Sequence, residues 1–145
     1  MLGHLGLWHP RHHRDMARGP WVKIYIAGAF ESQARLKPLR DRVQALGHEV
    51  VSTWLDEGSL LPPTPEESWA YAIRDLGEVR VCDLLILDTF DVNEQGGREF
   101  EAGVAFNGGA TLGVLRVGPS RNVFHELLGA YETWEAMLEW LGEQD

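Results

Sequence analysis

Short apolar runs alternate with segments of helical periodicity along most of the chain, and this alternation restricts the possible folds more than any other feature. Four runs are predicted strands: residues 22–28 (VKIYIAG), 48–54 (HEVVSTW), 83–88 (DLLILD) and 110–117 (ATLGVLRV). The run 83–88 is apolar between two aspartates, which is typical of a strand that is covered on both faces of a parallel sheet.

Helical patterns fill the intervals between these runs. Apolar residues recur at helical spacing from Glu31 to Leu46, and Gly47 then ends the helix. Further helices are expected from Thr64 or Ser68 to Val79, over 98–107, near 122–128 and after the capping residue Thr133. The apolar stripe of the second helix is Trp69, Ile73, Leu76 and Val79. The alternation predicts right-handed βαβ units and a three-layer α/β fold of the Rossmann-like (flavodoxin-like) type, with a parallel sheet and helices on both of its faces.

The domain boundary is predicted near residue 22. Residues 1–21 have no hydrophobic period and are interpreted as a flexible N-terminal extension, and residues 22–145 as a single domain. The chain has no apolar run long enough to span a membrane and no secretory signal pattern. It has one cysteine, Cys82, which excludes an internal disulfide and is interpreted as a core thiol. These features predict a cytoplasmic protein.

The charge is negative and unevenly distributed. The formal net charge is −9, although residues 1–22 carry three arginines against one aspartate. An acidic domain repels a phosphate backbone, so a polymeric nucleic acid is not an expected partner, whereas a small nucleoside or nucleotide is compatible. His9, His12 and His13 have helical spacing, but Pro10 interrupts the turn, so a disordered tail is preferred there to a metal site.

Ligands of open α/β sheets bind beyond the carboxyl ends of the strands. The candidate positions are therefore the segments after the predicted strands, namely 28–32, 54–56, 88–97 and 118–122. The chain has no P-loop, no GxGxxG fingerprint and no GxSxG elbow. The groups that remain for chemistry are carboxylates, and two of them, Glu99 and Glu101, stand in the stretch GGREFEAGVAF (96–106).

Five segments together resemble the nucleoside 2-deoxyribosyltransferases, a family that includes deoxynucleoside-monophosphate N-glycosidases and related small bacterial and phage proteins. They are KIYIAGAF, GHEVVSTWLDE, AIRDLGEVRVCDLLIL, GGREFEAGVAF and VGPSRNVFHEL, in this order over roughly residues 22–128. The resemblance implies that Glu101, in an E-x-G-x-A signature, is the nucleophile and that Asp75 is a second catalytic carboxylate. It also implies a site completed by a neighbouring subunit, with Asn122 in that region, and hence a homo-oligomer.

The residue types suit cleavage of an N-glycosidic bond. A carboxylate below the sugar can stabilise or bond to the cationic anomeric carbon, as in retaining glycosidases, and no metal or organic cofactor is needed. A helix N-terminus would favour the ionised form of Glu101. Glu99 lies about 200° away on the helix, so it is expected to cap the helix or face solvent. The alternative for both glutamates is a purely structural role at a helix N-terminus, and for Asp75 a solvated position.

The substrate-binding residues expected from the strand ends and the resemblance are Gly28, Phe30, Trp54, Asp88, Asp91, Gly97 and Asn122. Packing in the core is the alternative for Trp54. Tyr25 is interpreted either as a contact to the base or as a core residue, and His125 as a partly exposed helix residue or a contact between subunits. The expected activity is cleavage or exchange of the N-glycosidic bond of a nucleoside or nucleotide. The alternative is a nucleotide-binding or sensing module of the same fold without turnover.

Overall fold

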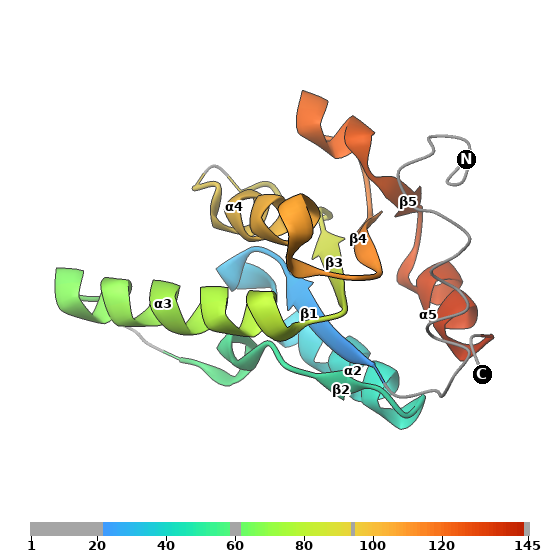
Figure 1. Cartoon of the computed structure of the whole chain (residues 1–145), viewed down its shortest axis with the longest axis horizontal. Helices are drawn as coiled ribbons and strands as arrows, with labels where there is room; N and C mark the ends of the chain where they lie inside the picture. Colours follow the sequence, from blue (N-terminus) through green and yellow to red (C-terminus); the bar gives the residue numbers. More distant parts are fainter. Residues whose placement is uncertain (1–21, 59–61, 94, 144–145) are drawn as a thin grey trace.

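Five parallel strands form one sheet in the order β2-β1-β3-β4-β5 (Figure 1). The computed structural model describes residues 22–58, 62–93 and 95–143, so the predictions for 1–21, including the histidine spacing, lie outside the described residues. The strands are β1 Lys23–Ala27, β2 Glu49–Val50, β3 Leu84–Asp88, β4 Gly113–Val117 and β5 Gly129–Tyr131. In the register of the central strands, Tyr25 pairs with Leu85, and Leu85 with Val114.

Helices cover both faces of this sheet, which confirms the predicted three-layer α/β fold. Helices α3 (Pro65–Val81) and α4 (Gly97–Val104) pack against each other and against β1, whereas α2 (Gln33–Ala45) packs against α5 (Trp134–Gly142). The core between the layers is formed by the strands' own apolar side chains, and all five residues of β3 are buried, as the run DLLILD predicts. No helix in the described part of the chain is long and apolar enough to cross a membrane.

The local signals at the helix ends account for their boundaries. Helix α3 begins with a capping box in which Thr64 and Glu67 satisfy each other's backbone N–H groups, and Thr133 caps α5 as predicted. Gly47 follows α2 with a φ of +100°, a conformation that glycine adopts without a steric penalty.

The second predicted strand is much shorter than expected. It ends at Val50, and residues Thr53–Asp56 form a 3-10 helix. Side chains beyond Val50 bind the backbone of β1 in place of the strand: Ser52 Oγ accepts from the Ile26 N–H at 3.0 Å, and Trp54 Nε1 donates to the Ile26 carbonyl at 2.7 Å. Strand β5, at the other edge, was not among the four predicted strands.

The predicted apolar stripe of α3 does not pack on the sheet as a whole. Val79 is fully buried, but Trp69 and Ile73 are 69% and 49% exposed. The helix projects along the sheet so that only its C-terminal half lies over the core (Figure 1). By contrast, the apolar side chains of α5 are buried within the chain.

Candidate active site

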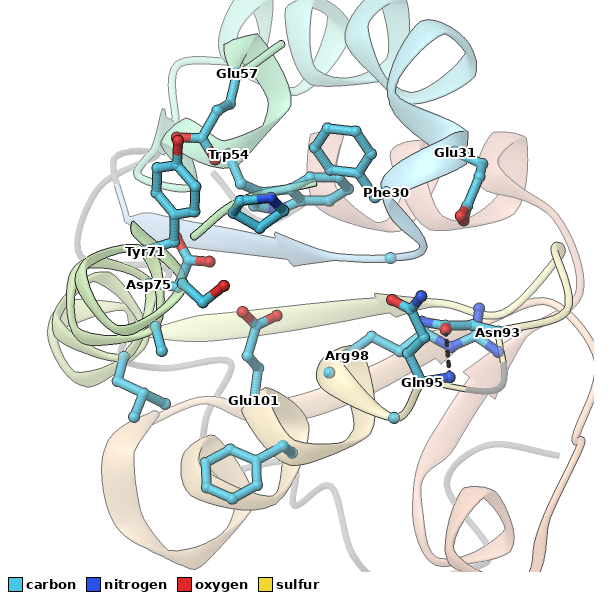
Figure 2. A pocket seen from close by; sticks show the side chains of 18 residues that line it. Phe30, Glu31, Trp54, Glu57, Tyr71, Asp75, Asn93, Gln95, Arg98 and Glu101 are labelled. Carbon is cyan, nitrogen blue, oxygen red and sulfur yellow. Dashed lines mark hydrogen bonds between the residues drawn. The ribbon is translucent and has the colours of Figure 1, made fainter. Parts of the chain in front are cut away.

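A cavity of about 790 Å³ opens at the carboxyl ends of β1 and β3 (Figure 2). In a sheet of this order the connections after β1 and β3 run to opposite faces, and such a switch point is where ligands bind in open α/β sheets. The loops after β1, β2 and β3 line the cavity together with α3 and α4. Of the predicted site residues, six line it: Gly28, Phe30, Trp54, Asp75, Gly97 and Glu101.

Glu101 points into this cavity from α4 (Figure 2). The helix begins at Gly97 after Gly96, whose φ of +82° favours glycine, so Glu101 is the fifth helical residue and stands in the second turn. Its backbone N–H is therefore not among the free N–H groups of the helix end, which correspond to the first four residues. The expectation that the helix N-terminus stabilises the Glu101 carboxylate is thus not met by the geometry.

Burial and one hydrogen bond determine the ionisation of Glu101 instead. Burial raises the pKa of Glu101 from 4.5 to about 7, against the effect of a hydrogen bond from Tyr25. Tyr25 Oη donates to Glu101 Oε2 at 2.8 Å, and the tyrosine itself is fully buried in β1. The pKa of Tyr25 is raised, first by burial and then by the Glu101 charge, so the phenol stays protonated and remains a donor. Tyr25 is therefore both a core residue and a partner of the candidate nucleophile.

Asp75 reaches the same cavity from α3 and faces Glu101 (Figure 2). Burial raises the pKa of Asp75, while hydrogen bonds from Arg74 oppose this effect. Arg74 Nη2 donates to Asp75 Oδ1 at 2.8 Å and to Glu57 Oε1 at 3.1 Å. Because Arg74 holds one oxygen of Asp75 and is anchored by Glu57, it fixes the orientation of the carboxyl group in the cavity.

Aromatic rings form the wall opposite Glu101. Phe30, Trp54 and Tyr71 line the cavity, and Phe30 is 47% exposed, so its ring is accessible to a molecule in the cavity. Trp54 is buried and fixed by its hydrogen bond to Ile26, so it packs in the core, and it also lines the cavity. Substrate binding by Trp54 stays a prediction. Flat aromatic side chains are suitable surfaces for stacking of a nucleobase.

Asp88 does not line the cavity. It is fully buried at the end of β3, where it accepts hydrogen bonds from Arg35 at 2.9 and 2.8 Å and from Trp134 Nε1 at 2.7 Å. These contacts join β3 to α2 and α5. The carboxylate expected to bind substrate is thus engaged in a structural network.

Asp91 lies near the cavity but not in it. Its carboxylate accepts hydrogen bonds from Ser32 and, at 3.0 Å, from Arg35. It lines a smaller hollow of about 400 Å³ that shares Glu31, Asn93 and Gln95 with the main cavity. Hydrogen bonds from Ser32 and then Arg35 lower the pKa of Asp91, so this carboxylate is held ionised beside the cavity mouth.

Asn122 is placed away from the cavity within the same chain. Its Oδ1 accepts from the N–H groups of Phe124 and His125 at 2.9 and 3.0 Å and thereby caps the 3-10 helix Val123–Leu127. It lines a separate hollow of about 470 Å³. A contribution of Asn122 to a neighbouring subunit's site stays a prediction.

Glu99 and His125 form a pair that the sequence did not indicate. His125 is 1% exposed, and its Nε2 lies 3.0 Å from Glu99 Oε2, while its Nδ1 accepts from the Arg121 N–H at 3.0 Å. The pKa of Glu99 is lowered because, despite burial, it accepts hydrogen bonds from Arg98 and His125. The interpretation of His125 as partly exposed is therefore wrong. Glu99 stands in the first turn of α4, where its own backbone N–H also lowers the pKa of its carboxyl group, and its side chain is half-buried rather than freely solvated. It does face away from Glu101's cavity, as the helical spacing predicts.

Three further residues contribute to the site and are not among those predicted from the sequence: Glu57, Tyr71 and Arg74. One signal could have identified Tyr71, because it precedes Asp75 by four residues and so shares its helix face. Within the described residues, no group of three or more His, Cys, Asp or Glu side chains is placed to hold a metal ion. Cys82 is buried, and burial raises the pKa of its thiol to about 12, as expected for a core thiol.

The fold and the position of the cavity define a flavodoxin-like α/β protein with a carboxylate-rich site at its switch point. Solved structures of the same fold include a 2-deoxyribosyltransferase from Bacillus psychrosaccharolyticus, with a TM-score of 0.66 and 20% identity over 80% of this chain and 90% of that one. The CMP N-glycosidase BcmB of Clostridium botulinum has a TM-score of 0.51 and 18% identity over 82% of this chain and 97% of that one. A conserved protein from Enterococcus faecalis V583 has a TM-score of 0.58 and 16% identity over 86% and 99%.

These similarities confirm, at the level of the fold, the resemblance found in the sequence. No protein-family model and no curated protein sequence matches the chain.

Proposed function

We propose that the chain is an enzyme of the nucleoside 2-deoxyribosyltransferase-like family that cleaves or transfers at the N-glycosidic bond of a nucleoside or nucleotide, with Glu101 as nucleophile. The observation that carries this proposal is the placement of the Glu101 carboxylate: it points into a cavity, faces a second carboxyl group and accepts a hydrogen bond from Tyr25. Two of the structural neighbours named above are a deoxyribosyltransferase and an N-glycosidase, which supports the same class of reaction.

In the proposed first step, a Glu101 oxygen forms a bond to C1′ as the bond from C1′ to the base nitrogen breaks. The electron pair of the broken bond goes to the base, which takes up a proton from Asp75. Glu101 and Asp75 face one cavity, and the charge of Asp75 raises the pKa of Glu101, so protonation of Asp75 favours ionisation of the nucleophile. The proposed reactive state therefore has Glu101 ionised and Asp75 protonated. Tyr25 stabilises the ionised nucleophile, and Arg74 orients Asp75.

In the second step, the bond between Glu101 and C1′ is broken by an acceptor. Water as acceptor releases the free sugar, and a second base gives a new nucleoside. In both cases the acceptor's proton returns to Asp75, so the step restores the starting state.

Self-association is part of the proposal. Several large apolar side chains of α3, α4 and the segments after α4 and β4 are exposed, namely Trp69, Ile73, Phe100, Phe106, Val123 and Phe124. Exposed apolar side chains at this density mark surfaces that bind another protein. A homo-oligomer that covers them would also reach the cavity at Phe100, which lines it. Sedimentation analysis that finds only monomer at micromolar concentration would remove this part of the proposal.

Product analysis tests the main proposal directly. The protein is incubated with deoxynucleosides, ribonucleosides and their monophosphates, with and without a second free base, and free and exchanged bases are separated by chromatography. Release or exchange should fall by at least about 10³-fold in Glu101→Gln, while Glu139→Gln, on the exposed side of α5, should match the wild type. Asp75→Asn should slow the reaction, and an unaltered rate would remove Asp75 from the mechanism. Ligand-induced stabilisation without any base release would instead identify a binding module.

A further inference from the structure

The lining of the main cavity is strongly acidic. Four carboxylate side chains reach it, those of Glu31, Glu57, Asp75 and Glu101, against one guanidinium, that of Arg98. The neighbouring segments outside the described residues contain no basic residue, since positions 59–61 are Ser, Leu and Leu and position 94 is Glu. The excess of negative charge therefore does not depend on those segments.

The arginines in and around the cavity are already occupied by partners of this chain. Arg98 is 2% exposed, and it donates to Glu99 Oε2 at 2.8 Å and to the carbonyls of Asp88 and Asp91 at 3.2 and 2.7 Å. Arg74 is bound by Glu57 and Asp75. Each guanidinium is thus neutralised or buried.

Two further arginines lie at this edge of the sheet. Arg35 is shared between the carboxylates of Asp88 and Asp91. Arg121 donates to the carbonyls of Thr89 and Phe90 and lines the neighbouring hollow, not the main cavity. Of these four arginines, Arg98 alone lines the main cavity, and its guanidinium is held by Glu99 and two backbone carbonyls.

Within the described part of the chain, neither end of the cavity offers an unpaired cation, and the end at Glu31 carries an uncompensated negative charge. Figure 2 shows Glu57 and Asp75 beside Tyr71 at one end, and Glu31 opposite Asn93 and Gln95 at the other. At the first end two carboxylates share one arginine, and at the second Glu31 has no cation partner among the described residues. With the sugar placed over Glu101, a 5′ substituent must approach one of these ends whichever way the nucleoside lies.

We propose that the site takes nucleosides with a free 5′-hydroxyl and rejects their 5′-monophosphates, and that Glu31 is a specificity-determining residue for this choice. The inference rests on the proposed function and narrows its substrate class. A phosphate monoester carries a charge of about −1.5 to −2 at pH 7, so it is repelled by these carboxylates. A 5′-hydroxyl can donate a hydrogen bond to the same carboxylates or to the amides of Asn93 and Gln95.

The test compares each of the four standard 2′-deoxynucleosides, and cytidine, with its own 5′-monophosphate, using the full chain. We expect kcat/KM for base release to be about 100-fold or more higher for the nucleoside at low salt, and this ratio to decrease at 0.5 M salt as the repulsion is screened. Glu31→Gln should lower the ratio by about 3- to 10-fold by improving the reaction of the monophosphate. Glu49→Gln makes the same charge change at the first residue of β2, which does not line the cavity, and it should leave the ratio as in the wild type.

Binding of the same pairs to Glu101→Gln, measured by calorimetry, separates this inference from the proposed function. If the wild-type protein releases no base from any compound, but Glu101→Gln binds the nucleosides more tightly than the monophosphates, the preference is upheld and the proposed activity is not. If a monophosphate is cleaved or bound as well as its nucleoside, or if the Glu31 and Glu49 variants change the ratio equally, the inference is overturned and the proposed activity can stand. Absence of base release by the wild-type protein together with absence of binding for every compound would overturn both.

Discussion

Replacing Glu101 with glutamine should make the protein more stable than the wild type at neutral and alkaline pH. The folded state raises the pKa of Glu101 above its unfolded value, so the folded protein binds more protons than the unfolded chain between about pH 4.5 and 7. Protonation of Glu101 therefore contributes to the free energy of unfolding. This contribution is fully present below pH 4.5 and is lost as the pH rises through about 7. A neutral amide at the same position has no such loss.

The magnitude follows from the two pKa values. A rise from 4.5 to about 7 reduces the free energy of unfolding by about 2.5 kcal/mol between pH 5 and pH 8, most of it below pH 7. Because Glu101 is largely buried, screening by solvent reduces this free-energy change only slightly. Urea unfolding at half-unit pH intervals should therefore give wild-type and Glu101→Gln curves that diverge as the pH rises. Glu139→Gln, on the exposed side of α5, serves as the control. Wild-type and Glu101→Gln stabilities that remain parallel from pH 5 to 8 would refute the assignment of Glu101 as a buried carboxylate of raised pKa.

Two further changes test the contacts around the site. Tyr25→Phe removes the hydrogen bond that stabilises ionised Glu101, worth about 1.5–3 kcal/mol for a bond to a charged group, so the acidic limb of the kcat/KM profile should move up by roughly 1–2 pH units. Tyr131→Phe, far from the cavity on β5, should leave the profile in place, and an equal movement in both variants would contradict the role of Tyr25. Gly118→Ala should destabilise the fold by about 2 kcal/mol or more, because Gly118 has a φ of +114° and a Cβ there would lie 2.7 Å from Thr89 Oγ1. Gly77→Ala, in the exposed interior of α3 with open space around it, should instead stabilise the protein by about 0.5–1 kcal/mol; denaturation midpoints that change in the same direction would contradict this contrast.

The layer order and the edge of the sheet that carries the site follow from local sequence signals. Apolar β-branched runs that alternate with helical patterns leave few topologies, and the run 83–88 identifies its strand as central without further information. The features that the sequence did not predict, such as the early end of β2, depend on contacts between residues far apart in the chain. The stretch HEVVSTW does not indicate that Ser52 and Trp54 will bind the backbone of β1, because these hydrogen bonds depend on the position of Ile26 in the folded chain.

The same limit applies to the site. Sequence spacing separates Glu101 from Glu99 on the helix surface, and the structure places them on different sides accordingly. However, spacing says nothing about the hydrogen bond between Glu101 and Tyr25, whose positions are 76 residues apart, or about the burial of His125 beneath Glu99. A charged residue is predicted to be exposed unless its partner is known, and here each partner comes from another loop or strand.

The choice of a phenol, rather than an arginine, as the partner of Glu101 has a chemical consequence. Arg74 is close enough to influence the pKa of Glu101, but its hydrogen bonds go to Glu57 and Asp75. A direct ion pair would hold Glu101 ionised at lower pH, and it would also neutralise the charge that must stabilise a cationic C1′. The neutral Tyr25 donor orients the carboxylate and leaves its net charge uncompensated. The fold therefore carries an energetic cost of about 3 kcal/mol at neutral pH for burying this group, and that cost is reduced when a cationic sugar centre forms beside it.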